Sequence, residues 1–218
     1  IDPQTGEFIP SKRLDAKQAV FRDPAVTATA QIIGPACLLD KITADLELEK
    51  LLNACFPNDY LQILSLAYFL VCRGGPLSHC EAWSTNHQHP YGKPLTTQRI
   101  TEILRVIDED SSQTFFNKWA RKVLEKDYLC YDITSVSSYS ELNEYVKYGY
   151  NRDGEKLKQV NLAMLFGQES QLPIYFRRLP GNIGDVSTLH NFLEAFRFLN
   201  LPKVHVVLDK GFYSLKNV

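Results

Sequence analysis

Hydrophobic residues follow two different periods along the chain, and the first of them is helical. Between Asp45 and Glu125, apolar side chains recur at three- and four-residue spacing, which is the period of an amphipathic helix. This spacing predicts helices over residues 45–55, 59–71, 97–107 and 112–124, with short helical stretches around Trp83. The expected helix caps are Asp59, Thr96 or Thr97, and Ser112. The acidic residues at 108–110 are expected to separate the last two helices.

From Leu129 onwards the spacing of apolar residues falls towards two, which indicates strands. The predicted strands span residues 129–137, 160–166, 173–179 and 204–208. One helix, Asp185–Leu199, is expected before the last strand, with Asp185 as its cap and apolar residues along one face. The order strand, strand, strand, helix, strand predicts an α/β fold preceded by an all-helical region.

Composition narrows the class of protein. A chain of 218 residues with 44% hydrophobic content can bury a substantial core. No stretch approaches the run of about eighteen apolar residues that crosses a bilayer, and the five cysteines are scattered, as in proteins with reduced thiols. The net charge is −1, so overall charge gives no argument for nucleic-acid binding. We expect a cytoplasmic protein without a membrane partner, whose contacts with nucleic acid come from local patches.

Two acidic residues adjoin strands that are otherwise apolar. Asp132 lies in the first strand, and Asp209 directly follows the last one. A charge at such a position is costly unless it is paired or holds a metal ion, and carboxylates aimed from neighbouring strands suit Mg²⁺ or Mn²⁺. Two such ions support phosphodiester chemistry. The alternative for each residue alone is a strand-end carboxylate that bonds to nearby backbone.

The sequence around these acids resembles a known family. The blocks are YDITS at 131–135, YGYNRDG at 148–154, LPGNIGDVSTL at 179–189 and LDKGFYS at 208–214. Four blocks in this order resemble the IS4-like insertion-sequence transposases of DDE type, especially the IS1634-type group. The resemblance covers about residues 129–218, and more loosely the helical segments between 33 and 125.

This resemblance implies a ribonuclease-H-like core in which Asp132 and Asp209 are catalytic residues and ligands of two Mg²⁺ or Mn²⁺ ions. The family's third ligand is a glutamate on a later helix, and the chain ends before such a segment, so we expect an N-terminal fragment with little cleavage activity of its own. The expected partner is double-stranded DNA, as terminal inverted repeats and target. The family further implies a homodimer or larger synaptic complex, located at the bacterial nucleoid.

The domain organisation expected from these patterns has three parts. An irregular N-terminal arm spans 1–34, a helical and possible DNA-binding domain spans 35–128, and a truncated ribonuclease-H-like catalytic core spans 129–218. Within the helical part, residues 75–107 are compatible with a helix-turn-helix, and a plain helical bundle is the alternative.

A modest basic stretch between Tyr145 and Arg178 carries interleaved tyrosines that are able to stack on bases while cations hold phosphates. The expected DNA contacts are Lys147, Tyr150, Arg152, Arg177, Arg178 and Lys210. A solvated hairpin is the alternative. Asn182 and Asp185 are expected to be structural, as a turn residue and a helix cap.

A group of cysteines and histidines invites a zinc interpretation, but its spacing departs from the usual ligand pattern. The residues are Cys72, His79, Cys80, His87 and His89.

Three functions fit the sequence as a whole. They are a transposase that cleaves DNA and transfers strands at element ends, a truncated and inactive remnant that binds DNA without cleaving it, and another ribonuclease-H-like nuclease.

Overall fold

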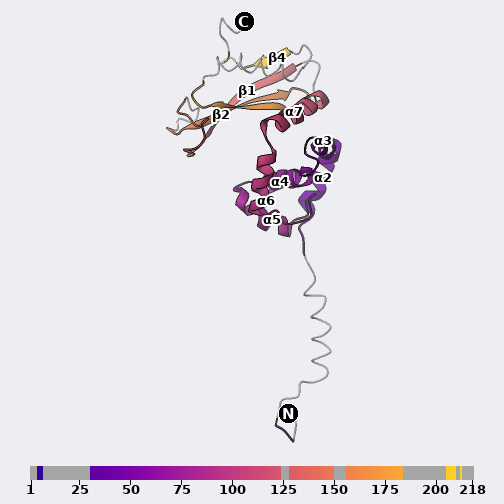
Figure 1. The fold of residues 1–218 in the computed structure, drawn as a ribbon. Coiled ribbons are helices and arrows are strands. Elements are labelled where there is room, and N and C mark those ends of the chain that lie inside the picture. The colour runs from indigo at the N-terminus through magenta and orange to yellow at the C-terminus, as the bar shows by residue number, and fades with distance from the viewer. Residues whose placement is uncertain are drawn as a thin grey trace. The chain divides into compact units, whose positions relative to one another are not determined.

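The computed structural model describes residues 4–6, 30–123, 128–149, 156–183, 205–209 and 212. The fold of these residues is mixed α/β, with six α-helices and a four-stranded sheet (Figure 1). The chain divides into two compact units, Ile1–Leu46 with Leu61–Glu102, and Glu47–Tyr60 with Ile103–Val218. Each unit is described separately below.

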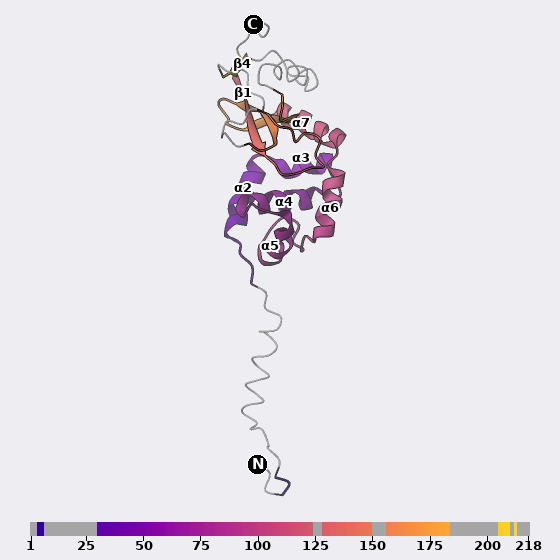
Figure 2. The same cartoon turned by 90° about the vertical axis from the view of Figure 1, so that its left-hand side faces the viewer.

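The first unit is helical, and α2, α4 and α5 lie side by side in both views (Figures 1 and 2). Its elements are α2 (Gly34–Asp45), α4 (Tyr60–Cys72), the 3-10 turn η1 (Leu77–His79), α5 (Cys80–Asn86) and α6 (Thr97–Val106). The helices predicted at 59–71, around Trp83 and at 97–107 are confirmed. None of the helices in the described part of the chain is long and apolar enough to span a membrane.

Helix α2 was not predicted, and its burial pattern explains why. Its buried residues are Ala36 and Thr43, whereas the larger Leu38 and Ile42 are exposed. Apolar residues therefore do not mark one face at a helical period, and no side chain caps the first turn. The helix begins with a proline in its first turn, a position that proline favours because no backbone hydrogen bond is lost there.

Hydroxyl groups join the helices of this unit. The Tyr68 hydroxyl on α4 donates to Asp40 Oδ1 at 2.9 Å and lies 3.0 Å from Thr43 Oγ1, so both partners are on α2. Ser84 Oγ accepts the Leu95 backbone N–H at 2.9 Å, which fixes the start of α6 against α5. Each bond satisfies a group that burial would otherwise leave without water.

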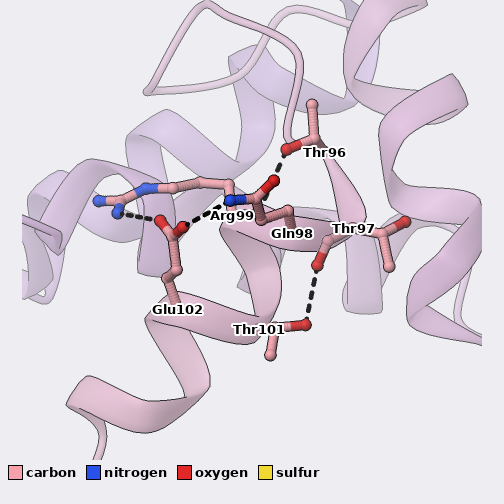
Figure 3. A network of polar contacts seen from close by, with 6 residues as sticks. All are labelled: Thr96, Thr97, Gln98, Arg99, Thr101 and Glu102. Atoms are coloured by element: carbon pink, nitrogen blue, oxygen red, sulfur yellow. Dashed lines mark hydrogen bonds and ion pairs between the residues drawn. The ribbon is translucent and has the colours of Figure 1, made fainter.

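A polar network surrounds the first turn of α6 (Figure 3). Thr96 Oγ1 accepts the Arg99 backbone N–H at 3.2 Å, so Thr96 is the cap that the sequence indicated. The Arg99 guanidinium donates to Glu102 at 2.9 Å, and Thr101 Oγ1 donates back to the Thr97 carbonyl at 3.0 Å. This outer face of α6 is thus held by its own neighbours, while Ile100 is buried on the inner face.

The second unit contains two helices and the sheet. Its elements are α3 (Leu48–Cys55), α7 (Glu109–Val123), β1 (Tyr128–Ser137), β2 (Gln159–Gly167), β3 (Pro173–Pro180) and β4 (His205–Leu208). The strand order is β3-β2-β1-β4; β2 runs antiparallel to both β1 and β3, and β4 runs parallel to β1. The four predicted strands are confirmed. The predicted helix Asp185–Leu199 lies outside the described residues.

Helix α7 begins earlier than its apolar pattern indicated. It starts at Glu109, and the Asp108 carboxylate accepts the Ser111 backbone N–H at 2.8 Å. Asp108 is therefore the cap, and the prediction that Ser112 caps this helix is wrong. Glu109 and Asp110 lie in the first turn, where the helix dipole favours negative charge, so the acidic run opens the helix.

One face of the sheet carries the core of this unit. Alternate residues of β1, among them Leu129, Tyr131 and Ile133, are buried. Helix α7 packs against β3 at this core, where the Phe116 ring contacts the Tyr175 ring at 5.0 Å. The indole N–H of Trp119 donates to the Pro173 carbonyl at 2.7 Å. The residues of β1 that alternate with these buried side chains therefore point to the opposite face of the sheet.

Candidate active site

The parallel pairing of β1 with β4 brings two acidic residues together. The register aligns Cys130 with Val207 and Tyr131 with Leu208. The next residue on each strand is an aspartate, Asp132 on β1 and Asp209 immediately after β4. Neighbouring strands lie about 4.8 Å apart, and residues in register on them point to the same face. The two carboxylates therefore start from adjacent positions at one end of β4.

Asp132 is exposed, on the face opposite the core. Its neighbours Tyr131 and Ile133 are 2% and 3% exposed, so the alternation of the strand fixes the direction of the carboxylate. Asp132 Oδ1 accepts the Ile133 backbone N–H at 2.8 Å. That bond uses one lone pair, and the remaining oxygen lone pairs face outwards.

Phe212 holds the backbone that carries Asp209. Its N–H donates to the Asp209 carbonyl at 3.0 Å, and its side chain is 1% exposed. The Phe212 ring lies 5.1 Å from the Tyr131 ring, on the strand that carries Asp132. A buried aromatic contact therefore links the segments that bear the two aspartates. The sequence analysis did not single out Phe212; its position three residues after Asp209 was the available signal.

The chemistry of the two residues fits a hard divalent cation. Carboxylate oxygens on adjacent strands are the ligands that Mg²⁺ and Mn²⁺ favour, and both ions keep several waters. No group of three or more His, Cys, Asp or Glu residues suited to a metal occurs within the described part of the chain. Within the described residues, Asp132 and Asp209 are thus two carboxylates of the type that such an ion binds.

The predicted DNA contacts fall on different surfaces. Lys147 is exposed beside β2, and Arg177 and Arg178 are both exposed on β3. The register joins Arg178 through Leu162 to Thr134, two residues beyond Asp132, so Arg178 shares the face of Asp132. Arg177 points to the other face by the alternation of the strand. Tyr150, Arg152 and Lys210 lie outside the described residues.

Buried amides, which the sequence analysis did not identify, hold the turn after β3. Asn161 Nδ2 donates to the Ile183 carbonyl at 3.0 Å, and Gln159 Nε2 donates to the Gly181 carbonyl at 3.1 Å. Ser135 Oγ donates to Asn161 Oδ1 at 3.0 Å. The available signal for this network was the pair Gln159 and Asn161, two amides at successive core-face positions of β2. Asn182 lies exposed in this turn, and Asp185 is outside the described residues.

Two of the histidines whose zinc interpretation the spacing disfavoured, His87 and His89, contact neighbouring groups of the helical unit. The His87 ring stacks on Trp83 at 4.9 Å and its Nδ1 lies 2.9 Å from the Trp83 carbonyl. His89 is buried, with Nε2 3.2 Å from the Ser84 carbonyl. Burial lowers the pKa of His89, while its bond to the Ser84 carbonyl raises it and the nearby His87 lowers it. Burial raises the pKa of the Cys80 thiol to about 11. These environments favour neutral side chains.

Comparison with known proteins identifies the second unit. The family model described as "Transposase DDE domain" matches residues 102–218, which is more than half of the chain. The matched residues include α7, the four strands, Asp132 and Asp209. No curated protein and no solved structure matches the chain. A transposase domain implies DNA as its partner. On the evidence of this match, the chain belongs to the family of DDE transposases.

Proposed function

We propose that Asp132 and Asp209 are catalytic residues of a transposase that cleaves DNA at the ends of an insertion sequence and transfers the strands to target DNA. The observation that carries this proposal is the parallel register of β1 and β4, in which Asp132 and Asp209 each directly follow the last aligned pair, Tyr131 and Leu208. The family match supports the reaction class.

In this proposal Asp132 and Asp209 hold Mg²⁺ or Mn²⁺, two ions in the complete site. When bound, such ions would supply activation of the attacking oxygen and stabilisation of the leaving oxygen in phosphodiester chemistry. The protein contributes the placement of its two carboxylates: β1 directs Asp132 away from the core, and Phe212 holds the backbone of Asp209. The third ligand proposed from the family is a glutamate on a later helix.

The finer assignments are part of the same proposal. They are the IS4-like, IS1634-type subgroup, a ribonuclease-H-like arrangement for 129–218, and a DNA-binding role for the helical region 35–128 behind the arm 1–34. The proposed partners are terminal inverted repeats and target DNA, bound by a homodimer or larger synaptic complex at the bacterial nucleoid. The proposed DNA contacts are Lys147, Tyr150, Arg152, Arg177, Arg178 and Lys210.

Metal binding is tested separately from cleavage. Fe²⁺ with ascorbate breaks a polypeptide next to the bound ion, so the full chain should be cut near Asp132 and near Asp209. Asp132→Asn and Asp209→Asn should each remove both cuts, because one carboxylate alone holds the cation weakly. Asp110→Asn, an exposed residue on α7, is the matched control and should leave the pattern unchanged. Cuts that persist in both site variants would exclude these residues as ligands.

Cleavage is then tested with labelled DNA that carries the ends of the element. The transposase proposal predicts slow nicking by this polypeptide in Mg²⁺ or Mn²⁺, in keeping with an incomplete ligand set, and Asp132→Asn should lower that nicking by about 100-fold or more, since removal of one catalytic electrostatic group has effects of this size. The alternative is a chain that binds these ends without cleaving them. Binding without nicking at any metal concentration would favour the alternative for this polypeptide.

A further inference from the structure

Cationic residues from three segments lie around the end of β3. The pairing of β3 with β2 runs as far as Pro180 opposite Val160. The next residue on β2, Gln159, pairs instead with Lys147, through backbone bonds of 3.0 and 2.8 Å. The segment around Lys147 thus continues the sheet edge that β3 leaves. Arg178 lies on the face of the sheet that carries Asp132, whereas Lys147 stands opposite the buried Gln159 and so points to the other face.

Two of these cations lie over tyrosine rings. Lys158 Nζ is 5.6 Å from the centre of the Tyr148 ring, and the Arg178 guanidinium carbon is 5.7 Å from the centre of the Tyr145 ring. A ring beneath a cation attracts it and limits the conformations of a long side chain, so less entropy is lost when that cation binds a ligand. We name Tyr145, Tyr148, Lys158 and Arg178 the cation–tyrosine surface.

The cation–tyrosine surface lies near the candidate active site. Arg178 is on the same face of the sheet as Asp132, and β2 lies between them. Arg178 is level with a position on β1 that is two residues from Asp132. With strands about 4.8 Å apart and a rise of about 3.3 Å per residue, their Cα atoms are roughly 12 Å apart. A DNA strand rises about 3.4 Å per nucleotide, so this distance corresponds to three or four nucleotides.

The charge around the end of β3 favours an anionic partner. Lys156 is also exposed, and among the described residues the acids on the preceding loop are Glu141 and Glu144, so the described cations outnumber the described carboxylates. The bases of DNA carry no negative charge for these cations to bind, whereas each nucleotide carries a negatively charged phosphate. The rings of Tyr145 and Tyr148 already have a cation over one face.

We propose that the cation–tyrosine surface binds the sugar–phosphate backbone of DNA beside the cleavage site, with Tyr145 and Tyr148 supporting the cations instead of stacking on bases. This inference rests on the proposed function, since it takes Asp132 and Asp209 as the place of cleavage. It replaces the role of base stacking expected for these tyrosines and adds Lys158 to the DNA contacts.

The test measures how DNA affinity depends on salt, with the full chain, a labelled duplex of unrelated sequence and no divalent metal. Each phosphate contact contributes about 0.9 to the slope of log affinity against log salt. Arg178→Gln and Lys158→Gln should each lower the slope by about 0.9. The loss of DNA affinity relative to the parent should therefore become about 3.5-fold smaller between 50 and 200 mM salt. Lys50→Gln on α3, whose side chain is 83% exposed, is the control and should keep the parent slope. Unchanged slopes for both Arg178→Gln and Lys158→Gln would overturn the proposal.

The role of the rings is tested with an abasic oligonucleotide, which keeps the backbone, and with the same oligonucleotide bearing bases. Tyr145→Phe and Tyr148→Phe should bind both as the parent does, and Tyr145→Leu and Tyr148→Leu should weaken both by about two- to fivefold. A loss confined to the oligonucleotide with bases would show stacking and overturn the proposal. Asp132→Asn should keep the parent salt slope, so a failure of cleavage and a failure of this surface are distinguishable.

Discussion

A methyl group at Gly181 should destabilise the second unit, because three backbone segments meet there. A Cβ atom at Gly181 would lie 2.0 Å from the Gln159 carbonyl oxygen and 2.7 Å from the Lys147 carbonyl oxygen. Carbon and oxygen atoms in contact stay about 3.3 Å apart, so the overlap exceeds 1 Å. Both obstacles are backbone atoms, so no rotation of a side chain relieves the clash.

The expected magnitude follows from the bonds that must be given up. The Gly181 N–H donates to the Tyr145 carbonyl at 3.1 Å, and the Gly181 carbonyl accepts from Gln159 Nε2 at 3.1 Å. Separating the segments leaves buried polar groups at a cost of about 1–3 kcal/mol each, and overpacking adds a similar amount. We expect Gly181→Ala to lower the free energy of unfolding of the second unit by roughly 4 kcal/mol.

The assay is urea unfolding followed by tryptophan fluorescence. The chain has two tryptophans, Trp83 in the first unit and Trp119 in the second, so a Trp83→Phe background makes Trp119 the reporter. With a slope of about 2 kcal/mol per molar urea, the midpoint should fall by about 2 M. Gly34→Ala is the control, because nothing lies within 4 Å of its Cβ position. A shift below about 0.3 M in Gly181→Ala would refute the close approach of these segments.

Three further predictions test other parts of the structure. Phe212→Ala should lower the free energy of unfolding in urea by about 3–5 kcal/mol, and Phe212→Leu should lower it by about 1 kcal/mol. Both variants should also bind Mn²⁺ more weakly in a titration followed by electron spin resonance, and equal Mn²⁺ affinity in the parent and both variants would contradict the role of Phe212. Because burial holds the pKa of His89 below its ordinary 6.5, the unfolded chain binds the proton more readily and the first unit should lose stability as the pH falls through about 6.5; His89→Gln should flatten that dependence in melting curves from pH 8 to 5, and identical pH slopes would speak against it. Native protein at pH 8 should react with iodoacetamide at the exposed Cys37 long before the buried Cys80, whose pKa is about 11; equal labelling by mass spectrometry would exclude this burial.

The sequence pattern predicted the elements that have one apolar face. The spacing of two along β1 and β2 gave strand bounds within one residue of those observed, because each strand buries alternate residues against the core. Helix α2 escaped because its large apolar residues are exposed. The start of α7 was missed because Asp108 caps a first turn that is acidic and not apolar.

The sequence identified the two aspartates of the candidate site, but it did not show that they are neighbours, because this depends on how the strands pair. Asp132 and Asp209 become neighbours only through the register of β1 with β4, which depends on which strand lies next to which. The cation–tyrosine contacts have the same origin, since Lys158 reaches Tyr148 across the bridge between Lys147 and Gln159. The close contacts of Gly149 and Gly181 are likewise long-range, and no local pattern marks them.

The parallel pairing of β1 with β4 also bears on when the two aspartates come together during synthesis of the chain. β1 lies in the middle of the sheet and can pair with β2 as soon as that hairpin has been made, whereas β4 comes later than β2 and β3 in the chain. Non-local pairings form late because loop closure must come first, and chains emerge from the ribosome in order. A nascent chain therefore carries Asp132 without Asp209 beside it, and the proposed pair of carboxylates forms only after synthesis has passed Asp209.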